Sequence, residues 1–154
     1  MILKKLFIIP LLLILTALTA CTEADKSSGV GKYGMMDKGT PEYAAISFFD
    51  YLYHDENIER AKTLSTDRMD RLLDNYRTNR NFQRHVINLP YDKVEMQIDS
   101  GNSNMRSEFA DQASITIFFT GTLHNETVQD LRTVNLTKVN GEWLVDEIEA
   151  DKFL

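Results

Sequence analysis

The sequence predicts an α+β domain in which helical segments come first and antiparallel strands follow. Residues 40–76 carry apolar side chains at helical spacing, whereas from residue 93 onward apolar and polar side chains alternate with a period of two. Asn140-Gly141 lies between two alternating runs and favours a type I′ hairpin turn, because both positions of that turn need a positive φ. Helices followed by consecutive strands indicate α+β rather than alternating α/β.

The first predicted helix begins after Thr40, whose side chain can cap it, and Pro41 suits the first helical position. A broad apolar stripe follows at helical spacing: Ala44, Ala45, Phe48, Phe49, Leu52 and Tyr53. The polar stretch 54–57 is predicted to end the helix. We expect Phe48, Phe49 and Leu52 to pack on the concave face of the sheet. Their expected partners are inward-facing strand residues, namely Ile115, Ile117 or Phe119.

Two further helices are predicted before the strands. A short one covers about Ile58–Ser65, and another begins at Thr66, with apolar residues at i, i+3, i+4 and i+7: Met69, Leu72, Leu73 and Tyr76. The stretch 79–89 shows no clear period. Pro90 disfavours helical backbone at Leu89, so the helical part must end there.

Four strands are predicted in the second half of the chain. They cover roughly residues 94–99, 113–120, 127–139 and 143–148, and the first has apolar residues only at alternate positions. Residues 100–104 form a polar loop, and a turn is expected near His124-Asn125. Such alternation is typical of an antiparallel sheet with one face on the core and the other in water.

The N-terminus has the organisation of a secretory signal. Lys4 and Lys5 precede an apolar run from Leu6 to Leu15, and small residues then lead to Cys21. The segment Leu18-Thr19-Ala20-Cys21 resembles the lipoprotein box of bacterial lipoproteins. That resemblance implies cleavage before Cys21 and attachment of several acyl chains, such as palmitate, to the cysteine thiol and the new amine. Several chains on one residue anchor a protein firmly in a bilayer.

The alternatives are an uncleaved membrane anchor and an ordinary signal peptide with a coincidental cysteine. The apolar run is shorter than the roughly 20 residues that span a bilayer, and Pro10 interrupts it. Cys21 is the only cysteine in the chain and stands where a lipoprotein needs it. We therefore predict a signal peptide over residues 1–20.

The mature chain would consist of a tether and one domain. Residues 21–39 are rich in Thr, Ser, Asp, Lys and Gly and are expected to form a flexible tether, and residues 40–154 the α+β domain. Loss of Lys4 and Lys5 with the signal changes the formal charge from −6 to −8. An acidic chain disfavours nucleic acid as a partner.

Two motifs resemble the NTF2-like superfamily: Ala45-x-x-Phe48-Phe49-x-x-Leu52 in the first helix and the closing Val139-Asn-Gly-Glu-Trp-Leu-Val145 hairpin. The similarity covers about Thr40–Ile148 and is closest to small bacterial lipoproteins of unknown function with a lumazine-binding-like domain. It implies a cone, in which a curved antiparallel sheet wraps around the first helices and encloses an apolar pocket. It implies no single activity, because one fold hosts many functions.

An enzyme built on such a cone would need an ionisable group in the pocket as a general base or acid. The candidates by residue type are His54, Asp55, His85, Tyr91 and Asp99. None lies in a catalytic motif that the sequence matches. His54 and Asp55 end a helix, where polar residues also serve solvation and capping, and His85 follows two arginines in a stretch expected at the surface.

No metal or cofactor site is predicted. The histidines at 54, 85 and 124 lack the close spacing of zinc ligands. Asp99, Asn102 and Asn104 do not match the spacing of an EF-hand loop. The chain also has no glycine-rich phosphate loop and no Gly-x-Ser-x-Gly motif.

The predicted function is that of an envelope lipoprotein held in a bilayer by acylated Cys21. Its domain would bind a small apolar ligand or a protein partner through the pocket or the sheet. The alternative is a pocket enzyme, isomerase-like or dehydratase-like, with an Asp or His general base. Thr22 stands where an Asp retains known lipoproteins at the inner membrane. We therefore expect the periplasmic face of the outer membrane, or the cell exterior in a bacterium with one membrane.

Overall fold

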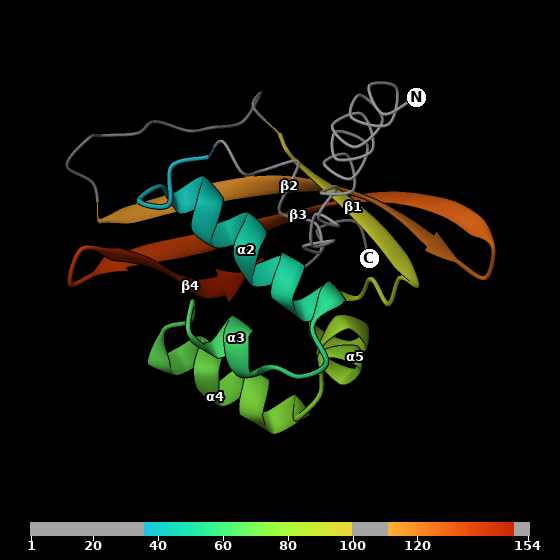
Figure 1. Cartoon of the computed structure of the whole chain (residues 1–154), viewed down its shortest axis with the longest axis horizontal. Coiled ribbons are helices and arrows are strands. Elements are labelled where there is room, and N and C mark those ends of the chain that lie inside the picture. The colour runs from blue at the N-terminus through green and yellow to red at the C-terminus, as the bar shows by residue number, and fades with distance from the viewer. Residues whose placement is uncertain (1–35, 100–110, 150–154) are drawn as a thin grey trace, which may run out of the picture.

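The computed structural model describes residues 36–99 and 111–149, and it confirms the α+β class (Figure 1). The helical elements are α2 (Pro41–His54), α3 (Glu59–Lys62), α4 (Asp67–Tyr76), α5 (Asn79–Phe82) and the π-helical turn η2 (Gln83–Ile87). The strands are β1 (Lys93–Ile98), β2 (Gln112–Leu123), β3 (Glu126–Val139) and β4 (Glu142–Ile148). Within the described ranges, every helix is too short or too polar to cross a membrane.

The strands form one four-stranded antiparallel sheet in the order β1-β2-β3-β4. Both tight hairpins turn at two residues with positive φ. The values are 52° and 67° at His124 and Asn125, and 52° and 90° at Asn140 and Gly141. The predicted turns are confirmed, because these dihedrals match the right-handed twist of the strands that they join.

Two helices begin where the sequence predicts them, and a threonine caps each. The Thr40 side chain accepts a hydrogen bond from the Tyr43 backbone N–H at 3.3 Å. The Thr66 side chain likewise accepts from the Met69 N–H at 3.4 Å. Each bond satisfies a donor that has no partner within its helix.

The second helix is shorter than the predicted span Ile58–Ser65. α3 has only four residues, because the chain after it pairs with β4 instead of continuing the helix. The Thr66 N–H donates to the Val145 carbonyl at 3.0 Å, and the Val145 N–H donates to the Leu64 carbonyl at 2.8 Å. This pairing attaches the α3–α4 turn to an edge strand whose N–H and C=O groups would otherwise lack partners.

The stretch without a clear period, 79–89, contains α5 and η2. Thr78 caps it by accepting from the Asn81 N–H at 3.2 Å, and Phe82 and Ile87 are fully buried. It ends at Asn88, whose φ of 60° is left-handed, two residues before Pro90. The buried apolar residues of this stretch are Phe82, Ile87 and Leu89, whose spacings of five and two residues do not produce a helical pattern in the sequence.

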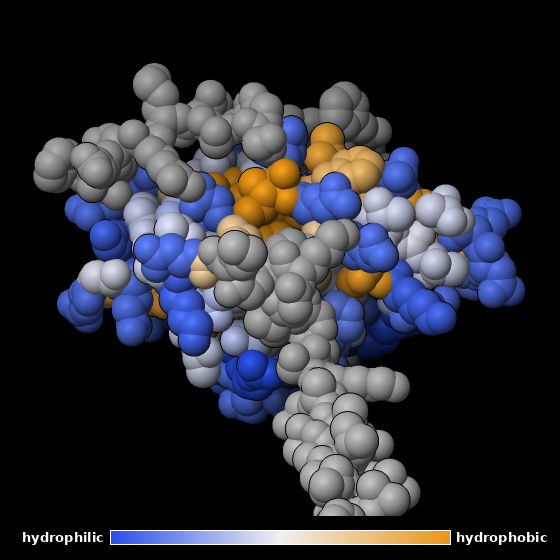
Figure 2. Space-filling view, turned by 45° about the horizontal axis from the view of Figure 1, so that its top comes forward, coloured by the Kyte–Doolittle hydropathy of each residue, from blue (hydrophilic) through white to orange (hydrophobic). Residues whose placement is uncertain are grey.

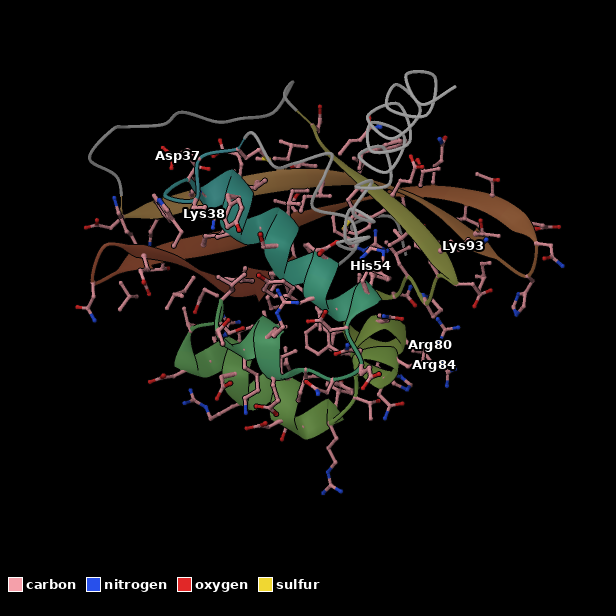
Figure 3. All side chains as sticks on the ribbon, viewed as in Figure 1. Asp37, Lys38, His54, Arg80, Arg84 and Lys93 are labelled. Atoms are coloured by element: carbon pink, nitrogen blue, oxygen red, sulfur yellow. The ribbon has the colours of Figure 1, made fainter. Side chains whose placement is uncertain are left out.

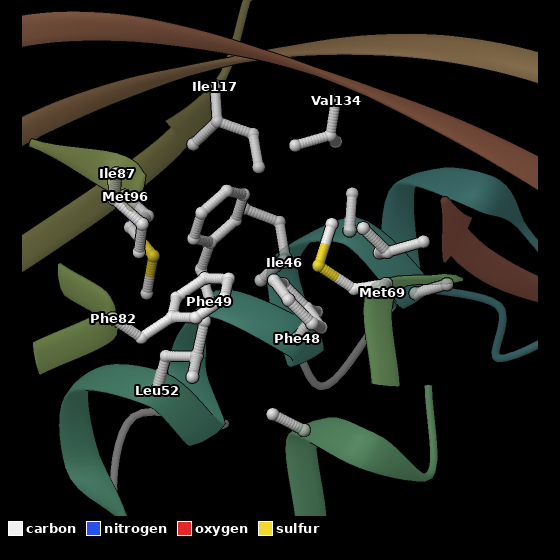
Figure 4. Close-up of a cluster of buried hydrophobic side chains, with 14 of the residues drawn as sticks. Ile46, Phe48, Phe49, Leu52, Met69, Phe82, Ile87, Met96, Ile117 and Val134 are labelled. Carbon is white, nitrogen blue, oxygen red and sulfur yellow. The ribbon is translucent and has the colours of Figure 1, made fainter. Parts of the chain in front are cut away.

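Helices and sheet meet in one hydrophobic core. Figure 1 shows all the helices on one side of the sheet, and in Figure 4 Ile117 and Val134 point from the strands toward α2. Phe49 packs edge-on against Phe119, with ring centroids 5.1 Å apart, as predicted. The Phe48 ring packs edge-on against Phe49 and Phe82, at 5.4 Å and 6.4 Å. It therefore joins α2 to α5.

The surface is largely hydrophilic. In the view of Figure 2 polar residues predominate, and hydrophobic residues gather in a small group near the centre. Among the described residues, the large apolar side chains that stay exposed are Leu131, at 47%, and Val139, at 41%. Single exposed apolar residues are common on folded domains and indicate no binding site by themselves.

Candidate functional site

A small cleft lies between the C-terminal end of α2 and the start of β1. We call it the α2–β1 cleft, and its volume is about 150 Å³. It is lined by Tyr53, His54, Tyr91, Asp92, Lys93 and Val94. Figure 3 shows His54 at the end of α2, with Lys93 at the start of β1. The cleft holds only a few water-sized groups, since one water takes up about 30 Å³ in the liquid.

His54 is held by a carboxylate one helical turn earlier. His54 Nδ1 lies 2.9 Å from Asp50 Oδ1. With Nδ1–H donating to the carboxylate, Nε2 keeps its lone pair and can accept a proton. Burial raises the pKa of the Asp50 carboxyl, and His54 lowers it in part. The side chain of Asp50 is 10% exposed and that of His54 33%, so only the imidazole is open to solvent.

We expect Asp50→Asn to flatten the pH dependence of stability on the acid side of neutrality. The raised pKa of Asp50 means that the folded state favours the protonated carboxyl. Asp50 therefore contributes stability below its unfolded pKa of about 4, and this contribution is lost as pH rises through the higher folded pKa. Melting temperatures across this range, measured for both proteins, test the prediction. An identical pH profile in the variant would contradict it.

Two of the residues that line the cleft are the tyrosines Tyr53 and Tyr91. Their rings stack, with centroids 6.4 Å apart and an interplanar angle of 26°. The Tyr53 hydroxyl donates to the Leu89 carbonyl at 2.7 Å, and burial raises the pKa of Tyr53 strongly. The Tyr91 ring packs directly on Gly121, where an added Cβ would lie 2.2 Å from Tyr91 Cγ. Only glycine leaves room for the ring at this position of β2.

The structure brings together three of the five predicted candidates. His54 and Tyr91 line the α2–β1 cleft, and Asp55 lines an adjoining hollow together with Tyr91. His85 lies elsewhere: it is exposed, as predicted, and stacks on Tyr76 with ring centroids 5.9 Å apart. Asp99 follows β1, and its N–H donates to the Thr116 carbonyl.

Sequence analysis missed two charged residues that the fold buries. Asp50 lies four residues before His54, and this spacing could have indicated their contact. Arg132 is 3% exposed on the inner face of β3. Its Nε donates to the Ile87 carbonyl at 2.8 Å, and its Nη1 lies 3.0 Å from Asp130 Oδ1. The sequence feature that could have indicated its burial is the spacing of two residues between Arg132 and Val134, which places both side chains on the same face of the strand.

A larger groove separates α4 from β4. We call it the α4–β4 groove, and its volume is about 540 Å³. Its apolar lining comes from Met69, Leu72, Val86 and Ile148. Arg68 bridges the two elements, with Nη1 3.2 Å from Asp146 Oδ2 and Nη2 3.2 Å from Glu147 Oε1. Both ion pairs are largely exposed, so they contribute little to stability.

No metal centre forms within residues 36–99 and 111–149, where three or more potential ligands nowhere come together. Asn102 and Asn104, considered above as calcium ligands, lie outside the described residues, as do Cys21 and the predicted signal. A comparison with known protein families finds no match. No curated protein matches the chain either.

Proposed function

We propose that the protein is an envelope lipoprotein, anchored through acylated Cys21, whose domain binds a small apolar ligand or a segment of a partner protein. The N-terminal signal and the single cysteine support the anchor. Helices packed on one side of an antiparallel sheet support an NTF2-like relationship. The acidic body fits a domain that stands clear of anionic headgroups, which repel it over a Debye length of about 8 Å.

The interior of the proposed cone is filled by the chain's own side chains. Phe49, Phe119 and Ile117 are fully buried between α2 and the sheet, and Phe48 is fully buried where α2 meets α5. An apolar ligand would have to displace this packing, which folded proteins keep dense. Binding therefore has to use a hollow at the surface.

The α4–β4 groove is the observation that carries the binding proposal. Its volume of about 540 Å³ lies within the range of roughly 300–1,000 Å³ that is usual for ligand pockets. Apolar side chains lie beside charges of both signs, since the lining also includes Arg68, Arg71, Asp74, Asp146 and Glu147. This mixture suits an amphipathic ligand or peptide better than a purely apolar one.

Leu72→Glu is expected to weaken apolar binding at the groove at least tenfold, which is about 1.4 kcal/mol. The new carboxylate would lose hydration when an apolar group covers it. The neutral dye N-phenyl-1-naphthylamine serves as a probe, with binding measured by its fluorescence. Leu131→Glu is the matched control, because Leu131 is an exposed leucine on β3 outside the groove. Equal loss in the two variants would contradict the groove as the site.

A second candidate function is proton abstraction by His54 in the α2–β1 cleft. The 2.9 Å contact with Asp50 favours it, because a carboxylate on Nδ1 orients the ring and leaves Nε2 as the nitrogen that faces a substrate proton. The cleft restricts substrates to small molecules, such as carbonyl compounds with an acidic C–H.

Exchange of that C–H hydrogen with D₂O, followed by NMR, tests the second candidate. We expect His54→Gln to lower the exchange rate by about 10²–10⁴-fold. His85→Gln is the control, because His85 is exposed and lies outside the cleft. Absence of exchange in the unaltered protein across a panel of such compounds would speak against catalysis.

A further inference from the structure

The sheet has a second face, which points away from the helices. Figure 1 shows all the helices on the other side of the sheet. Because side chains alternate along a strand, the even-numbered residues 112–122 of β2 and the odd-numbered residues 127–137 of β3 point to this second face. They lie opposite one another in six cross-strand pairs. We call these twelve residues the outer face.

The outer face carries no charge, since all twelve residues are uncharged. In a chain with 26% charged residues, about three of twelve would be expected to carry a charge. In β3 the usual arrangement is reversed, because Asp130 and Arg132 lie on the helix side, opposite Phe119 and Ile117 of the core. A strand with one face in water normally has its charges on that face. The outer face therefore differs from an ordinary solvated face.

The exposed apolar side chains also lie on this side of the sheet. Among the described residues, the large apolar side chains that stay exposed are Leu131, at 47%, and Val139, at 41%, and both occupy odd-numbered positions of β3. Leu131 lies directly opposite Phe118 of β2, which is half-buried. Either residue alone would need no explanation, but their place on the side without charges favours contact with another protein.

Polar side chains of the outer face bond to one another. The hydroxyl oxygens of Thr116 and Thr133 lie 2.9 Å apart, and Gln129 Nε2 donates to Thr120 Oγ1 at 3.4 Å. Burying a polar group costs less free energy when it already has a hydrogen-bond partner. A protein surface can therefore cover these residues at a low cost in desolvation.

Charged residues flank the outer face on both edge strands. Lys93 and Glu95 of β1 lie beside Thr122 and Thr120, on the same side of the sheet. On β4, Glu147 lies beside Asn135. Protein–protein interfaces have the same organisation, with few charges at the centre and a polar rim.

A second copy of the chain fits this face better than an ionic partner. The chain has a formal charge of −6, so two copies repel each other over most of their surface, and the outer face adds nothing to that repulsion. With strands about 4.8 Å apart and residues about 3.4 Å apart, the four strands present roughly 600 Å². This is the lower end of the roughly 600–1,000 Å² that each partner buries in a stable complex.

We propose that the protein forms a symmetric dimer in which the outer faces of two copies pack against each other. Such an interface uses the same patch on both copies, and sheets that pack face to face lie about 10 Å apart. None of the twelve residues lines the α4–β4 groove, so this proposal and the binding proposal can fail separately.

Sedimentation equilibrium of the full chain in density-matched detergent tests the dimer. We expect a dimer at about 0.1 mM, because an interface of this size fits a dissociation constant in the micromolar range. Leu131→Lys should weaken self-association at least tenfold, since the interface would bury two unpaired ammonium groups. Its side chain is half exposed, so the variant is expected to fold, as circular dichroism would show.

Asn81→Lys is the matched control, because it adds the same charge at an exposed position of α5, on the helix side of the sheet. It should change the dissociation constant less than twofold. A monomer at about 0.1 mM, or equal weakening in the two variants, would overturn the proposal.

Photochemical cross-linking in membranes identifies what covers the outer face. Phe118 is replaced by p-benzoylphenylalanine, and the same replacement at Asn81 is the control. We expect a product with twice the mass of the chain from position 118 and none from position 81. A product that contains a different protein would overturn the assignment to a second copy, and so would the absence of any product.

Discussion

Phe49→Ala is expected to lower the free energy of unfolding by about 3–5 kcal/mol. Phe49 is fully buried, and its ring contacts Phe48 from the same helix and Phe119 from β2. Truncation would remove these contacts and leave a cavity between α2 and the sheet. A domain of this size has a total stability of about 5–15 kcal/mol, so the variant would lose a large part of it. Urea denaturation followed by circular dichroism measures the change.

Val139→Ala is the matched control for Phe49→Ala. Val139 is an apolar residue at the end of β3 with 41% exposure, and its truncation should change stability by no more than about 0.5 kcal/mol. Similar losses in the two variants would mean that the core does not depend on the contact between α2 and β2.

Cys21→Ser is expected to abolish attachment of the lipid altogether. The proposed lipid is joined to the cysteine thiol, so the serine variant should remain unprocessed or be recovered outside the membrane fraction. Intact-mass analysis and fractionation measure both effects. Ser27→Ala in the tether is the control and should leave processing unchanged. An unmodified Cys21 in membrane-extracted protein would refute the lipoprotein proposal.

Thr22→Asp extends the same experiment to the location of the protein. If Thr22 permits transport to the outer membrane, an Asp at this position should hold the protein at the inner membrane. Recovery of the unaltered protein mainly with the inner membrane would contradict the proposed location.

Local chemistry made several elements predictable. A threonine followed by a proline starts α2, because capping and the fixed φ of proline act within one helical turn. Asn140-Gly141 forms its turn because few other residue pairs adopt positive φ twice. The alternation of side chains defined β1–β4 to within a few residues, since a half-buried strand requires it.

Long-range contacts decided what local patterns could not. α3 stops early because Thr66 and Leu64 pair with Val145, about eighty residues later in the chain. Phe48 turns toward Phe82, which lies in a stretch without periodicity. The burial of Arg132 depends on the Ile87 carbonyl, which no pattern around Arg132 indicates.

The candidate sites show the same division. Sequence alone determined the residue types at the end of α2, the acidic charge of the chain and the proposal of a lipid anchor at Cys21. Only the tertiary structure placed Tyr91 on Gly121 and brought it into one cleft with His54. The physical reason is the distance along the chain over which each effect acts. Capping, turn geometry and periodicity act over a few residues, whereas a binding site needs side chains from α2 and β1 to meet, and packing alone brings them together.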